Sequence, residues 1–233
     1  MSAEPHEMLD TGSGARYAAS RRVTLVSVAA NLFLTVAQVI IGVIGNSQAL
    51  VADGMHTLSD LTTDFMVLFA LKHGCKAADE EHPYGHARIE TAVTLILGII
   101  LFAVGVGIAA RAGFRLYAAE AFVQPAAMTL WVALATLGAK EWLFRYTLRT
   151  AERYDSNMLR ANAWHHRSDA VSSLIVVAGI GGSLIGWLYL DSVAAMVVAA
   201  MVVKVGYGLA RQALRELIDT RLSATDLEAI SRT

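Results

Sequence analysis

Two short motifs in the sequence each place a histidine and an aspartate four residues apart. His56 and Asp60 form the first pair, and His165 and Asp169 form the second. In an α-helix, residues four apart lie one above the other on the same face, about 6 Å apart along the axis. Two imidazoles and two carboxylates are the number and type of ligands that a tetrahedral Zn²⁺ site uses. The two motifs together therefore predict one divalent-metal site shared between two helices.

Other interpretations of such pairs are a buried polar contact between helices and the lining of a water-filled pore. For a lone histidine on an apolar face one of these would be the better interpretation, and the repeated motif is what favours metal binding. The metal itself is less closely defined. Manganese and iron(II) more readily take higher coordination numbers with more oxygen ligands, and the absence of cysteine from both motifs argues against copper(I).

Further polar residues accompany the motifs. Asp53 and Asp64 lie on the face of the first motif, within an arc of roughly 80°. They could form an outer metal shell, line a cation pathway or hydrogen-bond to neighbouring helices, and we expect direct ligation from neither. His166 points about 100° away from His165, which favours a role in packing or in supporting the ligands.

The elements that carry the motifs are long apolar segments. A membrane helix needs roughly 20 mostly apolar residues. Six segments qualify: 23–45, 48–71, 91–112, 127–148, 158–184 and 191–213. Only 17% of the residues are charged, against about 25% in a soluble domain. The sequence therefore predicts an all-α membrane protein with six transmembrane helices. We expect the polar residues at depth to bond between helices; these are Asn31, Gln38, Lys140 and Glu141.

Basic residues in the flanks predict the orientation. If the N-terminus is cytoplasmic, 14 Lys and Arg residues lie on the inner side and two, Arg111 and Arg115, lie outside. This asymmetry favours a cytoplasmic location for both the N-terminus and the C-terminus. We expect a cytoplasmic N-terminal segment at 1–22, a transport domain at 23–214, and the start of a truncated or absent cytoplasmic domain at 215–233. The N-terminus lacks the pattern of a cleaved signal peptide, and nothing indicates a nucleic-acid surface.

Two more segments complete a resemblance to a known family. Residues 45–53 read Gly-Asn-Ser-Gln-Ala-Leu-Val-Ala-Asp, and residues 78–86 read Ala-Asp-Glu-Glu-His-Pro-Tyr-Gly-His. Together with the two His-x-x-x-Asp motifs and the six-helix topology, they resemble the cation diffusion facilitator family from about Arg21 to Asp219. The resemblance implies a homodimer in the lipid bilayer that exports divalent metal in exchange for protons, by alternating access.

The resemblance also implies roles for individual residues. It assigns the transport site to His56, Asp60, His165 and Asp169, and the histidine on the first motif favours zinc. It implies a second metal site in the loop, at Asp79, His82 and His86, where the alternative is a hydrated loop with incidental histidines. It further implies a charge interlock between Arg88 and Asp219 near the dimer interface, where the alternative is two ordinary membrane-flanking charges.

Proton exchange also has a physical basis of its own. Metal ligation requires neutral histidine and ionised carboxylate, so protons and metal compete for the same groups. We expect His56 and His165 to be the proton-linked ligands of a secondary active transporter. The His-Glu-x-x-His motif of metalloproteases does not occur in the sequence, so we do not expect an enzyme. We expect no cofactor, and Zn²⁺ is the expected transported substrate. The alternatives are an Fe²⁺, Mn²⁺ or Cd²⁺ exporter and a non-transporting metal-binding scaffold. We expect the chain in a bacterial inner (cytoplasmic) membrane.

Overall fold

The computed structural model describes the backbone of residues 5–73, 87–118 and 123–218. It describes the side chains of residues 18–61, 91–118, 123–157 and 159–218. Within these ranges the chain forms six α-helices and no strand. They are α1 (Pro5–Ile44), α2 (Gln48–His73), α3 (Ala87–Tyr117), α4 (Ala127–Arg153), α5 (Asn157–Leu184) and α6 (Leu190–Leu217). The predicted all-α, six-helix organisation is confirmed.

Most helices are longer than the apolar segments that predict them. α1 begins at Pro5, well before the predicted start at residue 23, and α3, α4 and α6 continue four or more residues past their predicted ends. The last turns of these three helices carry Arg115, Arg153 and Arg215. Basic residues there interact favourably with the negative end of the helix dipole. The apolar pattern marks the part of a helix that suits a membrane, and the helix itself continues into its charged ends.

Three of the described helical segments are long and apolar enough to cross a membrane by length and composition: Ala18–Ile44, Thr91–Tyr117 and Leu190–Leu217. The other helices, α2, α4 and α5, contain more charge, but key charged residues on them, Asp53, Lys140 and Asp169, are buried inside the bundle. Large apolar side chains such as Phe33 and Trp131 are instead exposed. Polar groups inside and apolar groups outside are typical of a helical bundle surrounded by lipid.

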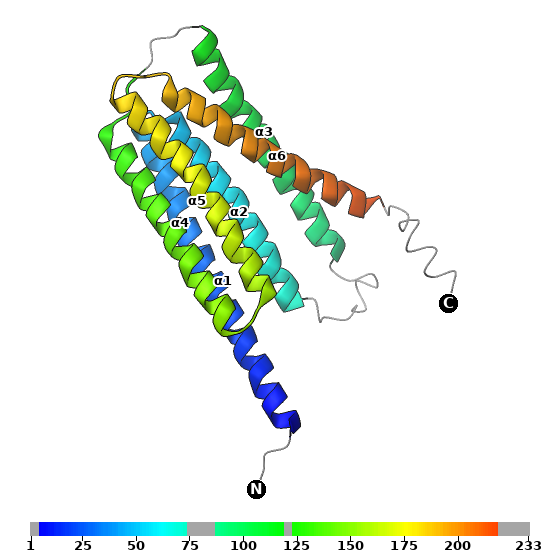
Figure 1. Ribbon diagram of the computed structural model, residues 1–233. Coiled ribbons are helices and arrows are strands. Elements are labelled where there is room, and N and C mark those ends of the chain that lie inside the picture. Colours follow the sequence, from blue (N-terminus) through cyan, green and yellow to red (C-terminus); the bar gives the residue numbers. More distant parts are fainter. Residues whose placement is uncertain (1–4, 74–86, 119–122, 219–233) are drawn as a thin grey trace, which may run out of the picture.

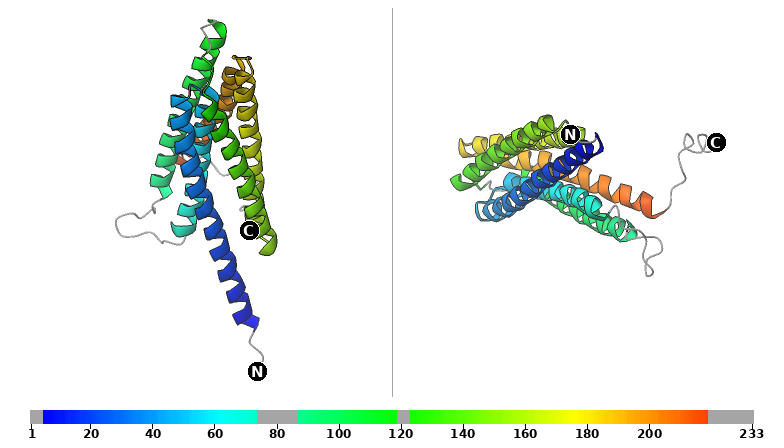
Figure 2. Two further views of the ribbon diagram at one scale, coloured as in Figure 1. Left: turned by 90° about the vertical axis from the view of Figure 1, so that its left-hand side faces the viewer. Right: turned by 90° about the horizontal axis from the view of Figure 1, so that it is seen from below.

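The helices form a bundle with an attached pair. α1, α2, α4 and α5 run side by side, and α3 and α6 pack together beside them (Figures 1 and 2). Glycines permit the close packing of this pair. A Cβ added at Gly98 would lie 2.6 Å from the backbone nitrogen of Ala210, and one at Gly206 would lie 2.5 Å from that of Phe102. Small residues let membrane helices approach in this way.

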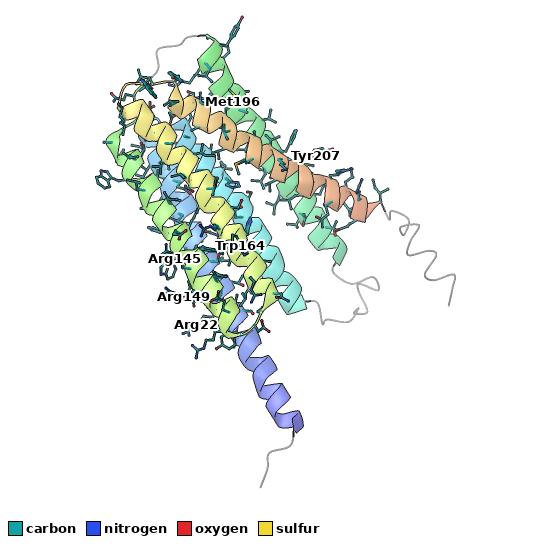
Figure 3. The ribbon with its side chains drawn as sticks, viewed as in Figure 1. Arg22, Arg145, Arg149, Trp164, Met196 and Tyr207 are labelled. Atoms are coloured by element: carbon teal, nitrogen blue, oxygen red, sulfur yellow. The ribbon has the colours of Figure 1, made fainter. Side chains whose placement is uncertain are left out.

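Successive helices alternate in direction, so α1 begins and α6 ends toward the same side of the molecule (Figure 1). Basic side chains gather on that side. Arg22 of α1 and both Arg145 and Arg149 of α4 lie toward the end of the bundle from which the first turns of α1 project (Figure 3). The clustering agrees with the charge asymmetry of the sequence, and the assignment of this side to the cytoplasm stays a prediction.

A carboxylate from α6 caps the start of α2. Asn46 turns the chain with a positive φ of 56°, and the Ser47 hydroxyl then donates a 2.6 Å hydrogen bond to Asp191. The backbone N–H of Gln48 donates to the other oxygen of Asp191 at 2.8 Å. The first N–H groups of a helix lack partners within the helix and carry a partial positive charge, so a buried carboxylate stabilises them. This cap fixes the starting point of the helix that carries the first motif.

Substitution of Asp191 by asparagine should therefore lower the stability of the bundle. The amide can accept only on one side and turns an N–H₂ group toward a second donor, Ser47 or Gln48. Leaving a buried polar group unpaired costs about 1–3 kcal/mol, so we expect a clear fall in the apparent melting temperature of the detergent-solubilised protein. Asp155→Asn, at a carboxylate whose side chain is 94% exposed, is the matched control. Equal melting temperatures for the two variants would contradict the capping role.

Candidate metal site

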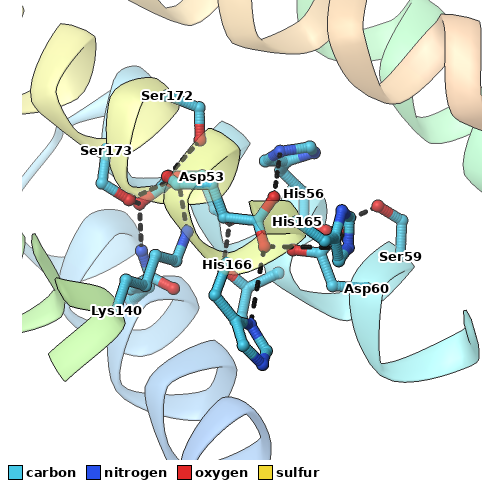
Figure 4. Close-up of polar contacts among 12 residues, drawn as sticks. Asp53, His56, Ser59, Asp60, Lys140, His165, His166, Ser172 and Ser173 are labelled. Carbon is cyan, nitrogen blue, oxygen red and sulfur yellow. Dashed lines mark hydrogen bonds and ion pairs between the residues drawn. The ribbon is translucent and has the colours of Figure 1, made fainter. Parts of the chain in front are cut away.

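The structure brings the four motif residues together between α2 and α5 (Figure 4). His56 Nε2 lies 3.9 Å from Asp169 Oδ1. His165 Nε2 lies 3.7 Å from Asp60 Oδ1 and 3.7 Å from Asp169 Oδ2. Each histidine therefore approaches a carboxylate on the opposite helix, and Asp169 lies between the two histidines.

The spacing of the donor atoms suits a metal ion. His56, Asp60 and Asp169 can each offer one ligand atom such that all three atoms lie within 4.8 Å of one another. Ligands of a tetrahedral zinc ion, at about 2.0–2.1 Å from the metal, are separated by roughly 3.4 Å. The closest separations here, 3.7 to 3.9 Å, are slightly larger, so a small inward movement of the side chains would surround an ion. His165 lies outside the compact group of three but close enough to both carboxylates to supply a fourth ligand.

The two histidines differ sharply in exposure. The side chains of His56, Asp60 and Asp169 are each 7% exposed or less, whereas that of His165 is 44% exposed. The candidate site is thus closed on three sides and open beside His165. An ion that enters from this side would meet His165 before the buried ligands.

The buried imidazole of His56 is distinguished by its hydrogen bonding. Both of its ring nitrogens are buried, and neither makes a hydrogen bond within the part of the chain that the structure describes. Buried side-chain nitrogens nearly always have a partner, because losing hydration without replacement is costly. A neutral imidazole with one free lone pair beside two carboxylates is a ready metal ligand.

His166 supports the site from outside. It is buried, with Nδ1 3.9 Å from Asp169 Oδ2 and Nε2 3.3 Å from the hydroxyl of Ser27 on α1. The amide of Asn31 donates to the same hydroxyl at 3.5 Å. His166 therefore links Asp169 to α1 and does not point at the centre of the candidate site. Asn31 bonds within α1 by this contact, and not between helices as predicted.

Asp53 belongs to a second polar cluster beside the first. Its carboxylate is fully buried and accepts hydrogen bonds from Gln38 Nε2 at 2.5 Å, Ser173 Oγ at 3.0 Å and Lys140 Nζ at 3.4 Å. These residues come from α1, α5 and α4, so of the three roles considered for Asp53 the structure shows bonding to neighbouring helices. Gln38 and Lys140 bond between helices as predicted. The prediction for Glu141 was wrong, because it pairs with Arg145 one turn along α4 at a partly exposed position.

Several predicted residues lie outside the described parts of the chain. Asp79, His82 and His86 of the loop site, and Asp219 of the charge interlock, are among them. For Asp64 and Arg88 only the backbone is described, in α2 and α3. The loop site and the interlock therefore stay predictions. The Lys140–Asp53 pair and the Asp191 cap are the features that sequence reasoning missed as contacts, although Lys140, Asp53 and Gln38 stood out in the sequence as polar residues at depth.

Six helices with apolar exteriors, enclosing histidine and aspartate side chains placed for a cation, define an integral membrane protein with a polar site inside its bundle. The sequence from residue 24 to residue 218 matches the family model of the cation efflux transmembrane domain. The chain therefore belongs to the cation diffusion facilitator family, as its motifs indicated.

Individual relatives agree with this membership. The chain is 34% identical over 226 residues to metal tolerance protein C1 of Arabidopsis thaliana, covering 91% of this chain and 48% of that protein. It is 31% identical to mitochondrial metal transporter 2 of Saccharomyces cerevisiae, over 88% of this chain and 47% of that protein. It is 33% identical to manganese efflux system protein MneP of Bacillus subtilis, over 86% of this chain and 69% of that protein. The chain thus spans about half the length of the first two.

Proposed function

We propose that the protein exports divalent metal cations from the cytoplasm in exchange for protons, with His56, Asp60, His165 and Asp169 as the transport site. The observation that carries the proposal is the buried imidazole of His56. Among the described residues it has no hydrogen-bond partner, and it lies in one compact group with two carboxylates. The family membership supports the same activity, as do relatives named for metal transport and metal efflux.

Zinc is the first candidate substrate. Two nitrogen and two oxygen donors from two helices match a four-coordinate zinc site. Manganese is the second candidate, because two relatives, at 33% and 32% identity, are named manganese efflux system proteins. Manganese prefers more oxygen ligands, which water or a further carboxylate would have to supply here.

Alternating access would expose this one site to each side of the membrane in turn. The half-exposed His165 supports entry of the ion along its side of the site. The basic residues gathered at the end of the bundle from which the first turns of α1 project support a cytoplasmic N-terminus. Protons would move in the direction opposite to the metal, because each imidazole that releases metal can take up a proton. The proposal includes a homodimer, for which the family resemblance is the support.

Flux into proteoliposomes tests the proposal. The unmodified chain is reconstituted, a pH gradient is imposed, and Zn²⁺, Mn²⁺, Fe²⁺ and Cd²⁺ are compared against protein-free vesicles. We expect zinc flux that follows the gradient and stops when a protonophore dissipates it. Zinc binding without flux of any ion would overturn the transport proposal and favour the scaffold alternative. Flux confined to manganese or iron would overturn the zinc assignment alone.

A further inference from the structure

A buried ion pair lies one helical turn from the candidate metal site. Lys140 and Asp53 are 2% and 0% exposed, and Lys140 Nζ is 3.4 Å from Asp53 Oδ1. Ser173 and Gln38 donate to the same carboxylate. Both oxygens of Asp53 are therefore occupied by donors from three other helices, and Figure 4 shows this cluster beside the histidines and aspartates of the site.

Stability alone gives little reason for this pair. An ammonium and a carboxylate both lose their hydration when buried, and replacing a buried pair with neutral residues of similar size is often neutral or stabilising. Ionisable residues inside a membrane bundle are costly and commonly have a functional role. The position of Asp53 suggests which role. It precedes His56 by three residues on α2, and helical residues three apart are neighbours with Cβ atoms roughly 5–6 Å apart.

The charges of the site explain what a free Asp53 would do. Two neutral histidines and two ionised aspartates balance one divalent ion. A third carboxylate beside them would leave an excess negative charge, and it would offer an extra oxygen ligand. Oxygen-rich, higher-coordinate sites suit manganese better than a four-coordinate site with two nitrogen donors does. An excess negative charge in a poorly hydrated site would also bind any divalent ion more tightly and slow its release.

We propose that Lys140 is a specificity-determining residue of the transport site. Its ammonium group holds Asp53 away from the ion and cancels its charge, so that the ion meets two carboxylates and not three. The inference rests on the proposed metal site and adds a reason for its four-coordinate preference. Lys140 acts through Asp53 and is not itself a ligand.

Lys140→Met removes the ammonium group and keeps most of the side-chain volume. We expect this variant to bind divalent metal at least about tenfold more tightly than the unmodified chain, with a larger gain for Mn²⁺ than for Zn²⁺. Transport should show a lower KM together with a lower kcat, because release from the tighter site is slower. Binding is measured by titration calorimetry in detergent, and transport by the proteoliposome assay. A loss of packing alone would not tighten binding.

Two further variants keep the test decisive if Lys140→Met folds poorly. Asp53→Asn leaves the ammonium group uncompensated beside the cation, so metal affinity should fall at least about tenfold. Combining Lys140→Met with Asp53→Asn removes both charges and should return the affinity to within about threefold of the unmodified chain. Unchanged or weaker binding in a folded Lys140→Met variant would overturn the inference. So would a combined variant that binds no better than Asp53→Asn. If the unmodified chain binds no metal, the proposed transport site itself is overturned. If the unmodified chain binds metal but the variants do not change its affinity as expected, only the Lys140 inference fails.

Discussion

Substitution of Asp169 by asparagine is expected to reduce metal flux by a factor of about 100 or more. Asp169 is the carboxylate that both histidines approach, at 3.9 Å from His56 and 3.7 Å from His165. It also belongs to the compact group that could hold an ion. Loss of residues that merely orient metal ligands commonly costs 10–100-fold in metal affinity or activity, so removing the charge of a central ligand should cost more. The amide has nearly the same shape, so the packing of α5 is retained.

The measurement is initial zinc flux into proteoliposomes at equal protein density. Asp155→Asn is the matched control, because it makes the same chemical change at a side chain that is 94% exposed and that precedes the start of α5, 14 residues before Asp169. Circular dichroism and gel filtration of both variants establish that the bundle is intact. An Asp169→Asn variant with at least half of the unmodified flux would show that the ion is held elsewhere.

Local spacing in the sequence predicts which residues of the site share a helical face, but it does not predict which two helices face each other. The four-residue spacing of His56 and Asp60 defines one helical face, and local geometry is sufficient for that step. That α2 and α5 turn these faces toward each other depends on packing between residues more than 100 positions apart. Spacing alone does not determine such packing, and the repeated motif together with the family resemblance supplied it. The six helices themselves followed from apolar length.

The buried contacts that the sequence did not identify join distant segments. Lys140 and Asp53 are 87 residues apart, and Asp191 and Ser47 are 144 apart. A charge at depth in an apolar helix indicates that some partner exists, because an unpaired one is too costly, but it does not identify the partner. The difference in exposure between His165 and His56 has the same origin. The two motifs have the same pattern, and only the surrounding helices make one histidine open and the other closed.

Metal affinity is expected to rise by at least about tenfold from acid to neutral pH. Both histidines must be neutral and both aspartates ionised to bind the ion, so protons compete with the metal for the same four groups. At acid pH each metal ion must displace protons from these groups, and at neutral pH less proton release is needed. The sign follows directly: acid weakens binding, and this is the condition under which imported protons would help to expel the metal.

Titration calorimetry in buffers of different ionisation enthalpy measures this linkage, because the buffer takes up the released protons. We expect the logarithm of the affinity to rise with pH for the unmodified chain, with a slope that equals the number of protons released per ion bound. His165→Gln should reduce this slope, because it removes one proton-linked ligand. His166→Gln is the control: His166 lies 3.9 Å from Asp169 on the side of Ser27 and is not proposed as a ligand, so its loss should leave the slope unchanged. A slope that is unchanged in His165→Gln and falls in His166→Gln would exchange their roles, and an affinity independent of pH would remove the basis for proton exchange at this site.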